Sequence, residues 1–180
     1  RNLWMLSRYM PTERLQIEFL NVSRNIPAYE GDTLAPANWG QEMAFAISMF
    51  ASPLAWMEMS ALPEASRQAL KQMISAYRPV QAEILAGQVL PIGQEPDGFG
   101  WTGFQSIGED GKGFILILRE KNAGNTHRYT LWGVKNQKLR LESILGDVAA
   151  AVVAVDGEGN AEFMLDKPFS YGLYRYETVE

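Results

Sequence analysis

Three carboxylates and two tryptophans in the first third of the chain are the side chains best suited to chemistry. Glu30 and Asp32 fall in a loop that contains Pro and Gly, and Glu58 closes an apolar run. Two carboxyl groups about 5 to 5.5 Å apart, flanking a glycosidic oxygen, can hydrolyse a sugar with retention of configuration. Trp39 and Trp56 could offer the flat apolar surface on which a pyranose ring stacks. These five residues are therefore the candidates for binding a substrate.

Each of these residues also has a simpler explanation. A turn rich in Gly and Asp is usually solvated structure, which would account for Glu30 and Asp32. Glu58 is flanked by apolar side chains, so we expect it either to pair with a cation inside the fold or to belong to a site. The two tryptophans could be ordinary core residues. Both explanations stay open on the sequence alone.

The composition excludes several classes of function. The 180 residues carry a net charge of −5 and their 16 Lys and Arg are scattered, which is not the electrostatic footprint of a nucleic-acid binder. There is no Cys and a single His, His127, so we expect no metal site and no cofactor. No apolar stretch approaches the roughly 20 residues that a membrane span needs, so we expect no membrane partner. Asp156–Asn160 lacks the ligand pattern of a calcium loop and predicts a hairpin turn.

Helices and a buried strand must position the candidate residues. The apolar run Phe50–Met59 is typical of a strand buried on both faces, which we place at residues 53–59. An acid at the C-terminal end of such a strand is where barrel enzymes carry functional side chains. We expect helices at residues 12–22, at 38–50 and from Pro63 to Ala86. This order of elements predicts the last part of a TIM-type barrel.

From Phe99 onward the apolar period changes from that of a helix to that of a strand. Turn signals recur about every 8 to 12 residues, which predicts an antiparallel β-sandwich with one inward row on each strand. The predicted strands are 101–107, 113–119, 127–134, 138–144, 149–155, 160–165 and 169–177. The predicted inward residues are Phe114, Leu116, Leu118, Leu131, Leu139, Leu141, Val153 and Phe163.

The chain therefore divides into three parts. We expect an α/β segment, the end of a barrel, over residues 1–88, a Pro- and Gly-rich hinge over 89–98, and an all-β antiparallel sandwich over 99–180. The apolar helix at 38–50 has too few partners within the first part. We expect the remainder of a parent barrel, or another chain, to cover residues 1–88.

Several motifs together resemble the last part of melibiase-type α-galactosidases. They are Met43–Leu54, the pair Tyr77-Arg78, Gly87 and the segment Ile92–Gly98. In that family a helix ending in a small-Pro-Leu segment leads into the last barrel strand. A helix with a Tyr-Lys/Arg pair, a hinge similar to Ile-Asn-Gln-Asp-Pro-x-Gly and an antiparallel β-domain follow. Glu13–Phe19 is also similar to an Arg-Leu-Lys-Ile-Gln-Tyr segment of the larger members.

The resemblance implies a fragment of a retaining glycoside hydrolase that acts on α-galactoside-like sugars. It implies a galactoside-like carbohydrate as partner and a periplasmic or secreted location. The family's nucleophile and acid/base aspartates lie on earlier barrel strands, so catalytic residues are expected upstream of Arg1 and the fragment alone is expected to be inactive. In the hinge, Gly93 stands where the family has Asn and Glu95 where it has Asp.

Two other functions are compatible with the sequence. A non-catalytic carbohydrate-recognition or interaction module would be favoured by exposed, coplanar rings on one sheet face, for example Trp101, Tyr129 and Trp132. An α+β domain whose aromatic residues are simply core would need no ligand at all.

Overall fold

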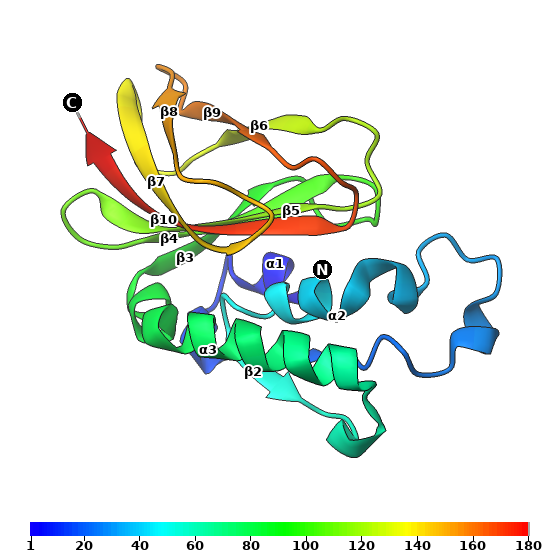
Figure 1. The fold of residues 1–180 in the computed structure, drawn as a ribbon. Coiled ribbons are helices and arrows are strands. Elements are labelled where there is room, and N and C mark those ends of the chain that lie inside the picture. Colours follow the sequence, from blue (N-terminus) through cyan, green and yellow to red (C-terminus); the bar gives the residue numbers. More distant parts are fainter. Residues whose placement is uncertain (180) are drawn as a thin grey trace.

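A six-stranded antiparallel sheet forms the centre of the molecule. The structure is a computed structural model that describes residues 1–179. The strand order is β3-β4-β5-β10-β7-β8, with every neighbouring pair antiparallel. The bounds are β3 Gln88–Gly93, β4 Trp101–Ile107, β5 Lys112–Arg119, β7 Gln137–Gly146, β8 Ala151–Val155 and β10 Ser170–Val179. Figure 1 shows this sheet above the helices.

A second, two-stranded sheet packs on one face of the large sheet. It consists of β6 (Thr126–Thr130) and β9 (Asn160–Met164), which pair antiparallel. Its inward Tyr129 and Phe163 share a core with Ile115 and Ile117 of β5. This half is therefore the sandwich-like antiparallel structure that the period-two pattern predicts.

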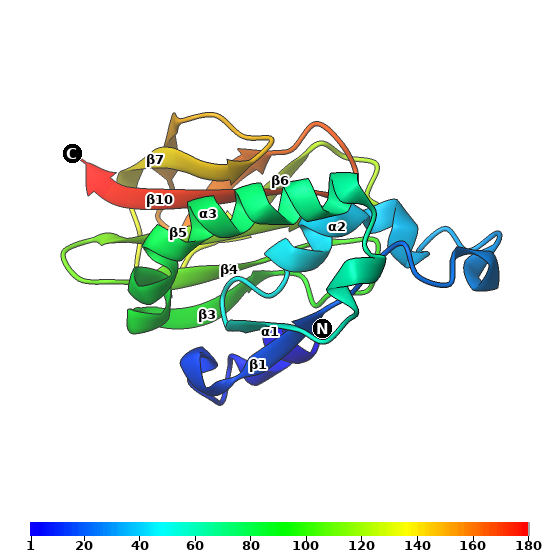
Figure 2. The same cartoon turned by 60° about the horizontal axis from the view of Figure 1, so that its bottom comes forward.

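Helices cover the other face of the sheet. They are α1 (Asn2–Leu6), α2 (Pro36–Ala46) and α3 (Glu64–Ala86), with short 3₁₀ turns at Thr12–Arg14, Ile26–Tyr29 and Met59–Ala61. Figure 2 shows α3 running along the sheet beside α2. Met43, Phe45 and Phe50 are buried in a core that also contains Phe104 and Leu116 of the sheet. We expected the remainder of a parent barrel or another chain to bury the apolar helix predicted at 38–50. The sheet of the same chain buries it instead.

The predicted inward row needs one correction. All of its members are buried except the half-buried Val153. However, Phe114, Leu116 and Leu118 pack against the helices, and Ile115 and Ile117 fill the sandwich instead. The reason is that the sheet is covered on both sides, so the apolar residues of β5 form a continuous run and not an alternation.

Helix α3 matches its prediction closely. Its buried residues Leu70, Met73, Tyr77, Val80 and Ile84 recur at three- and four-residue steps, which places them on one face. The helix continues through Pro79, where we would expect a kink, and ends at Gly87. A Cβ at Gly87 would lie 2.3 Å from the Ser106 hydroxyl oxygen, so only glycine allows this close approach to the sheet.

The first 60 residues contain a parallel strand pair, β1 (Gln16–Phe19) and β2 (Ser52–Ala55). The helix predicted at 12–22 is therefore wrong, because Ile17 and Phe19 alternate with polar residues as a strand requires. The strand predicted at 53–59 is present but ends at Ala55. Two parallel strands do not by themselves define a barrel.

The predicted hinge is also shorter than expected. Residues Gln88–Gly93 form β3, an edge strand paired with β4, and only the segment that follows is irregular. Proline is tolerated on an edge strand because no further neighbour needs its missing N–H. Pro91 therefore signals an edge position in this sheet and not a break between domains.

Candidate functional site

The C-terminal ends of β1 and β2 lie side by side and form the candidate site. Because the strands are parallel with Phe19 opposite Ala55, the residues that follow each strand leave the same edge. Trp56 is 75% exposed there, and Leu20 is 59% exposed. Ligands of parallel sheets bind outside this end of the strands. We call Leu20, Trp56 and Glu58 the strand-end rim.

Glu58 is an exposed member of this rim. It immediately precedes the 3₁₀ turn Met59–Ala61. Within residues 1–179 no ion pair involves its carboxylate. The structural ion pair that would have explained this acid is absent from that part of the chain, so the carboxylate can accept hydrogen bonds from a ligand.

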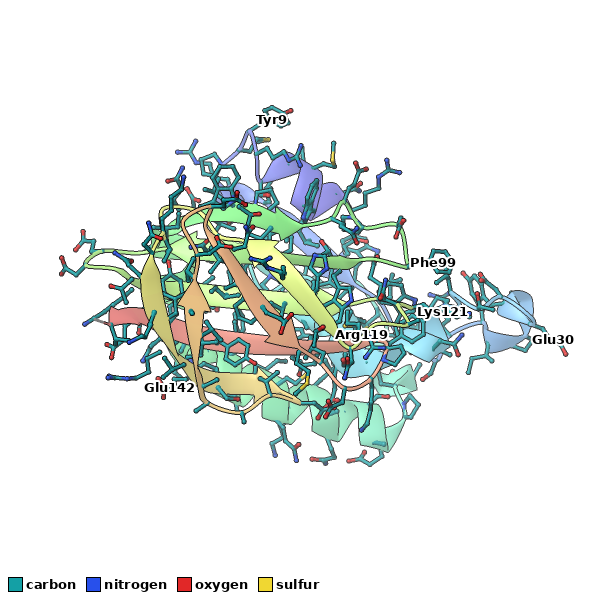
Figure 3. The ribbon with its side chains drawn as sticks, turned by 90° about the horizontal axis from the view of Figure 1, so that it is seen from above. Tyr9, Glu30, Phe99, Arg119, Lys121 and Glu142 are labelled. Atoms are coloured by element: carbon teal, nitrogen blue, oxygen red, sulfur yellow. The ribbon has the colours of Figure 1, made fainter. Side chains whose placement is uncertain are left out.

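Glu30 and Asp32 belong to a segment that projects from the body of the molecule. The Asp32 carboxylate accepts the Leu34 backbone N–H at 2.8 Å, so it shapes the turn that leads into α2. Figure 3 places Glu30 at the outer tip of the projection. Asp32 thus has a structural role, and the structure does not bring Glu30 toward the body of the molecule.

Trp39 lies at the junction between the helices and the sheet. Its indole N–H donates to the Leu34 carbonyl at 3.1 Å, and its ring lies 5.1 Å from that of Phe169, tilted by 52°. The side chain is half-buried. Trp39 is therefore packed against its neighbours and only partly accessible, whereas Trp56 is exposed and free to stack on a ligand.

An apolar groove of about 360 Å³ separates Trp39 from the rim. It is lined mainly by Phe19, Leu20, Val22, Leu34, Trp39 and Ile47. Gln41, a buried residue of α2 that the sequence reasoning missed, fixes its wall. The amide of Gln41 donates to the Leu20 carbonyl at 2.7 Å and accepts from the Val22 N–H at 3.4 Å. A polar residue within an otherwise apolar helical segment is the sequence signal that could have revealed Gln41.

Glu120 is a buried carboxylate that the sequence reasoning also missed. Its Oε2 accepts the backbone N–H groups of Asp97, Gly98 and Gly100 at 3.3, 2.9 and 3.0 Å. A carboxylate held by several backbone donors is well satisfied inside a protein. Glu120 therefore fixes the turn between β3 and β4, which is a structural role.

The aromatic residues of the sandwich do not form a stacking platform. Trp101 is 2% exposed and Tyr129 is fully buried, whereas Trp132 is half-exposed. His127 stacks on Trp101 with ring centroids 5.8 Å apart, and burial lowers the pKa of His127. The coplanar exposed set that would favour a sheet-face binding module is therefore not present among these residues.

Within residues 1–179, no group of three or more His, Cys, Asp or Glu side chains is arranged to hold a metal ion. In the same part of the chain, none of the helices combines the length and the apolar character that crossing a bilayer requires.

Comparisons with known proteins give a likeness of fold. No family model matches the sequence, and no curated protein matches it. The GH36 α-galactosidase AgaA of Geobacillus stearothermophilus matches 76% of this chain with a TM-score of 0.53 and 14% identity. AgaB of the same organism matches 76% with a TM-score of 0.54 and 14% identity. An AgaA variant in complex with raffinose matches 76% with a TM-score of 0.53 and 16% identity.

The predicted resemblance to α-galactosidases is confirmed by these matches at the level of the fold. The chain covers 19% of each of these enzymes, so it corresponds to about a fifth of their length. Identities of 14 to 16% carry no information about individual catalytic residues. These matches therefore show a likeness of fold alone.

Proposed function

We propose that this chain is the C-terminal part of a retaining glycoside hydrolase that acts on α-galactoside-like sugars. It would supply the last strands of a (β/α)₈ barrel, the rim beside them and the β-domain. The observation that carries the proposal is the parallel pair β1–β2, which is followed through α3 by an antiparallel sheet. The likeness of fold to GH36 α-galactosidases supports it.

The parallel pair lacks the neighbours that a barrel strand has. Strands of parallel sheets are covered on both faces and paired on both edges. Here Gln16, Glu18 and Ala55 are exposed, and β1 and β2 pair only with each other in the described chain. Further parallel strands of a longer protein would provide the missing neighbours of β1 and β2.

The rim would then contact the sugar without performing the chemistry. Trp56 would stack on an apolar sugar face, and the Glu58 carboxylate would accept a hydrogen bond from a sugar hydroxyl. Retaining hydrolysis needs a nucleophile and an acid/base carboxyl at a fixed separation. We place that pair on strands that precede Arg1 in the parent protein.

The test is an assay of the isolated chain beside its full-length parent on aryl α-galactosides. We expect turnover by the parent alone. In the parent, Glu58→Gln should raise KM several-fold more than it lowers kcat, because a rim contact acts on binding. Turnover by the isolated chain, abolished by Glu58→Gln, would refute the proposal and make Glu58 catalytic.

A non-catalytic carbohydrate-binding module is the second candidate. The observation in its favour is Trp56, a large aromatic side chain that is 75% exposed. It would be the better description if the parent bound α-galactosides through Trp56 and hydrolysed none of the aryl glycosides.

A further inference from the structure

The two edge strands of the large sheet, β3 and β8, are protected to different degrees. At β3, the Trp4 indole N–H donates to the Ile92 carbonyl at 3.1 Å. The Trp132 indole N–H donates to the Pro91 carbonyl at 3.0 Å, and Pro91 has no N–H of its own. A further strand would therefore find few free backbone groups on β3.

Strand β8 carries no comparable protection. It pairs with β7 on one side, and within residues 1–179 no other backbone group bonds to Ala151–Val155. The next strand along the chain, β9, pairs with β6 instead. Figure 1 shows β8 well away from the helices, so the helical layer does not cover its outer edge. The N–H and C=O groups of this edge are free to pair with another strand.

The side chains of this edge are small and apolar. Residues 149–155 read Ala-Ala-Ala-Val-Val-Ala-Val, without a charged residue or a proline. Val152 is 60% exposed and Ala154 is exposed, whereas Val155 is buried in the sandwich. Natural edge strands usually carry a Lys, a Pro or a bulge that prevents pairing. An uncharged run without such a residue favours pairing with a second strand.

We propose that β8 is a self-association site, through which two copies of this chain join their large sheets. The two β8 strands would lie antiparallel about a two-fold axis, with Val153 at the centre and Val152 opposite Ala154 of the other copy. Such a contact uses the same surface on both copies. Because β3 is protected, each copy offers one open edge of its large sheet, and the assembly stops at a dimer.

The charges at the two ends of the run favour a second copy over a charged foreign strand. Asp156, which follows β8, pairs with Arg128 at 2.5 Å. Asp147, which precedes the run, meets Lys167 at 4.0 Å. Each acid thus has a cation in its own chain, and neither end of the run selects a partner of opposite charge. An equally uncharged strand, such as β8 itself, fits this edge.

The cations of the neighbouring strand do not prevent the pairing. Lys138 and Arg140 of β7 lie opposite Ala154 and Val152. In the dimer, three strand spacings, or about 14 Å, would separate these cations from those of the other copy. This separation exceeds the Debye length of about 8 Å at physiological ionic strength, so the repulsion is screened. Arg140 is also paired with Glu177.

The size of the contact sets its strength. The 5 residues of β8 are far fewer than those that a stable interface contributes on each side, which number roughly 20 to 30. The dimer should therefore be weak and form between about 0.1 and 1 mM protein. It needs neither a sugar nor a catalytic pair, so this inference goes beyond the function proposed above.

The test is sedimentation equilibrium of the full chain from micromolar to millimolar concentration. We expect the average mass to rise from 20.2 kDa toward twice that value. Val152→Lys should weaken self-association about fivefold or more, because the two new cations would lie diagonally across the strand pair, about 7 to 8 Å apart. Val152→Thr keeps the branched shape without a charge. It is the matched control and should associate like the wild type.

A charge swap tests the two-fold geometry. A mixture of Val152→Lys and Val152→Glu chains should form heterodimers more readily than either variant forms homodimers, because the diagonal pair then has opposite charges. Met164→Lys makes the same charge change at an exposed residue at the end of β9, and it should leave self-association unchanged. Val152 is exposed, so its variants should fold. Ala154→Lys is the second variant if they do not.

Three results would overturn the proposal. They are a mass that stays at 20.2 kDa at about 1 mM protein, self-association that neither Val152→Lys nor Ala154→Lys weakens, and growth beyond a dimer. A chain that stays monomeric while a short uncharged Thr/Val peptide shifts its β8 amides in NMR would accept a foreign strand, which would also overturn self-association. No turnover is measured, so failure here and failure of the hydrolase proposal are distinguishable.

Discussion

The large sheet and the parallel pair β1–β2 differ in how completely their strands are covered by other parts of the chain. In β5 every residue from Gly113 to Arg119 is buried, with helices on one face and the β6–β9 sheet on the other. In the parallel pair only Phe19 is buried. The antiparallel half thus supplies its own neighbours, and the parallel half does not.

This difference follows from where in the sequence the neighbours of each strand lie, which the pattern of a single strand does not reveal. Antiparallel strands can be joined by short turns, as β4–β5 and β7–β8 are, and the strands β5, β7 and β10 that pair across longer distances all belong to this half of the chain. Parallel strands need long crossovers, and their neighbours lie far away in sequence. The open edges and faces of β1 and β2 are therefore the part of the molecule on which the barrel proposal rests.

The largest effect should come from a core truncation in the completed sheet. Leu116→Ala should lower the free energy of unfolding by about 2 to 5 kcal/mol, because Leu116 is fully buried. Ile17→Ala in β1 should cost about 1 kcal/mol or less in the isolated chain, since Ile17 is only half-buried. Urea unfolding of both variants checks this difference.

The stability cost of the same two variants can also be measured in the full-length parent and compared with their cost in the isolated chain. If missing barrel strands cover β1 there, Ile17→Ala should cost more in the parent than in the isolated chain. An equal cost in both would mean that no further strand packs on β1, which would contradict the barrel proposal.

A smaller effect is expected at the link between the two regions. The Tyr77 hydroxyl of α3 donates to the Met49 carbonyl at 2.6 Å, just before β2 begins. Tyr77→Phe removes the donor and leaves that carbonyl without this bond, so it should cost about 1 to 2 kcal/mol by urea unfolding. Tyr9→Phe, at a side chain that is 79% exposed, is the control and should cost nothing measurable.

The sequence predicted the completed region better than the open one. The strand at 101–107 and helix α3 match the structure because turn signals, a first-turn Pro and a clear apolar period all agree there. The error at 12–22 arose because Leu15, Phe19 and Val22 fit a helical spacing, while Leu15, Ile17 and Phe19 fit the spacing of a strand equally well. The hinge prediction took Pro91 as a break, whereas an edge strand tolerates it.

The positions of the candidate residues were predicted only in part. Trp56 and Glu58 do lie exposed after β2, as a strand-end position requires. Asp32 proved to shape a turn and Trp39 to pack at the layer junction. The role of Glu120 depends on backbone donors 20 or more residues away, such as the Gly100 N–H, and no local pattern encodes such contacts.

A modest difference in stability is expected between variants of Glu30 and Asp32, the two acids of the projecting segment. Asp32→Ala removes the acceptor of the Leu34 N–H and should cost about 0.5 to 1 kcal/mol. Glu30→Ala, at the outer tip, should leave stability unchanged. Urea unfolding measures both, and equal costs for the two variants would contradict the structural role assigned to Asp32.

The smallest effect concerns His127, which belongs to the completed region. Burial beside Trp101 lowers the pKa of His127 in the folded chain, whereas in the unfolded chain the pKa of His127 is about 6.5. The unfolded state therefore binds a proton more readily, and stability should fall as the pH drops below about 6.5, with no such loss above that value. His127→Gln should remove this part of the pH dependence. The check is the difference in unfolding free energy between wild type and His127→Gln, measured from pH 8 to pH 5 so that the shared carboxylate titrations cancel. A difference independent of pH would show that the ring is as well solvated in the folded chain as in the unfolded one, and would contradict the buried stack on Trp101.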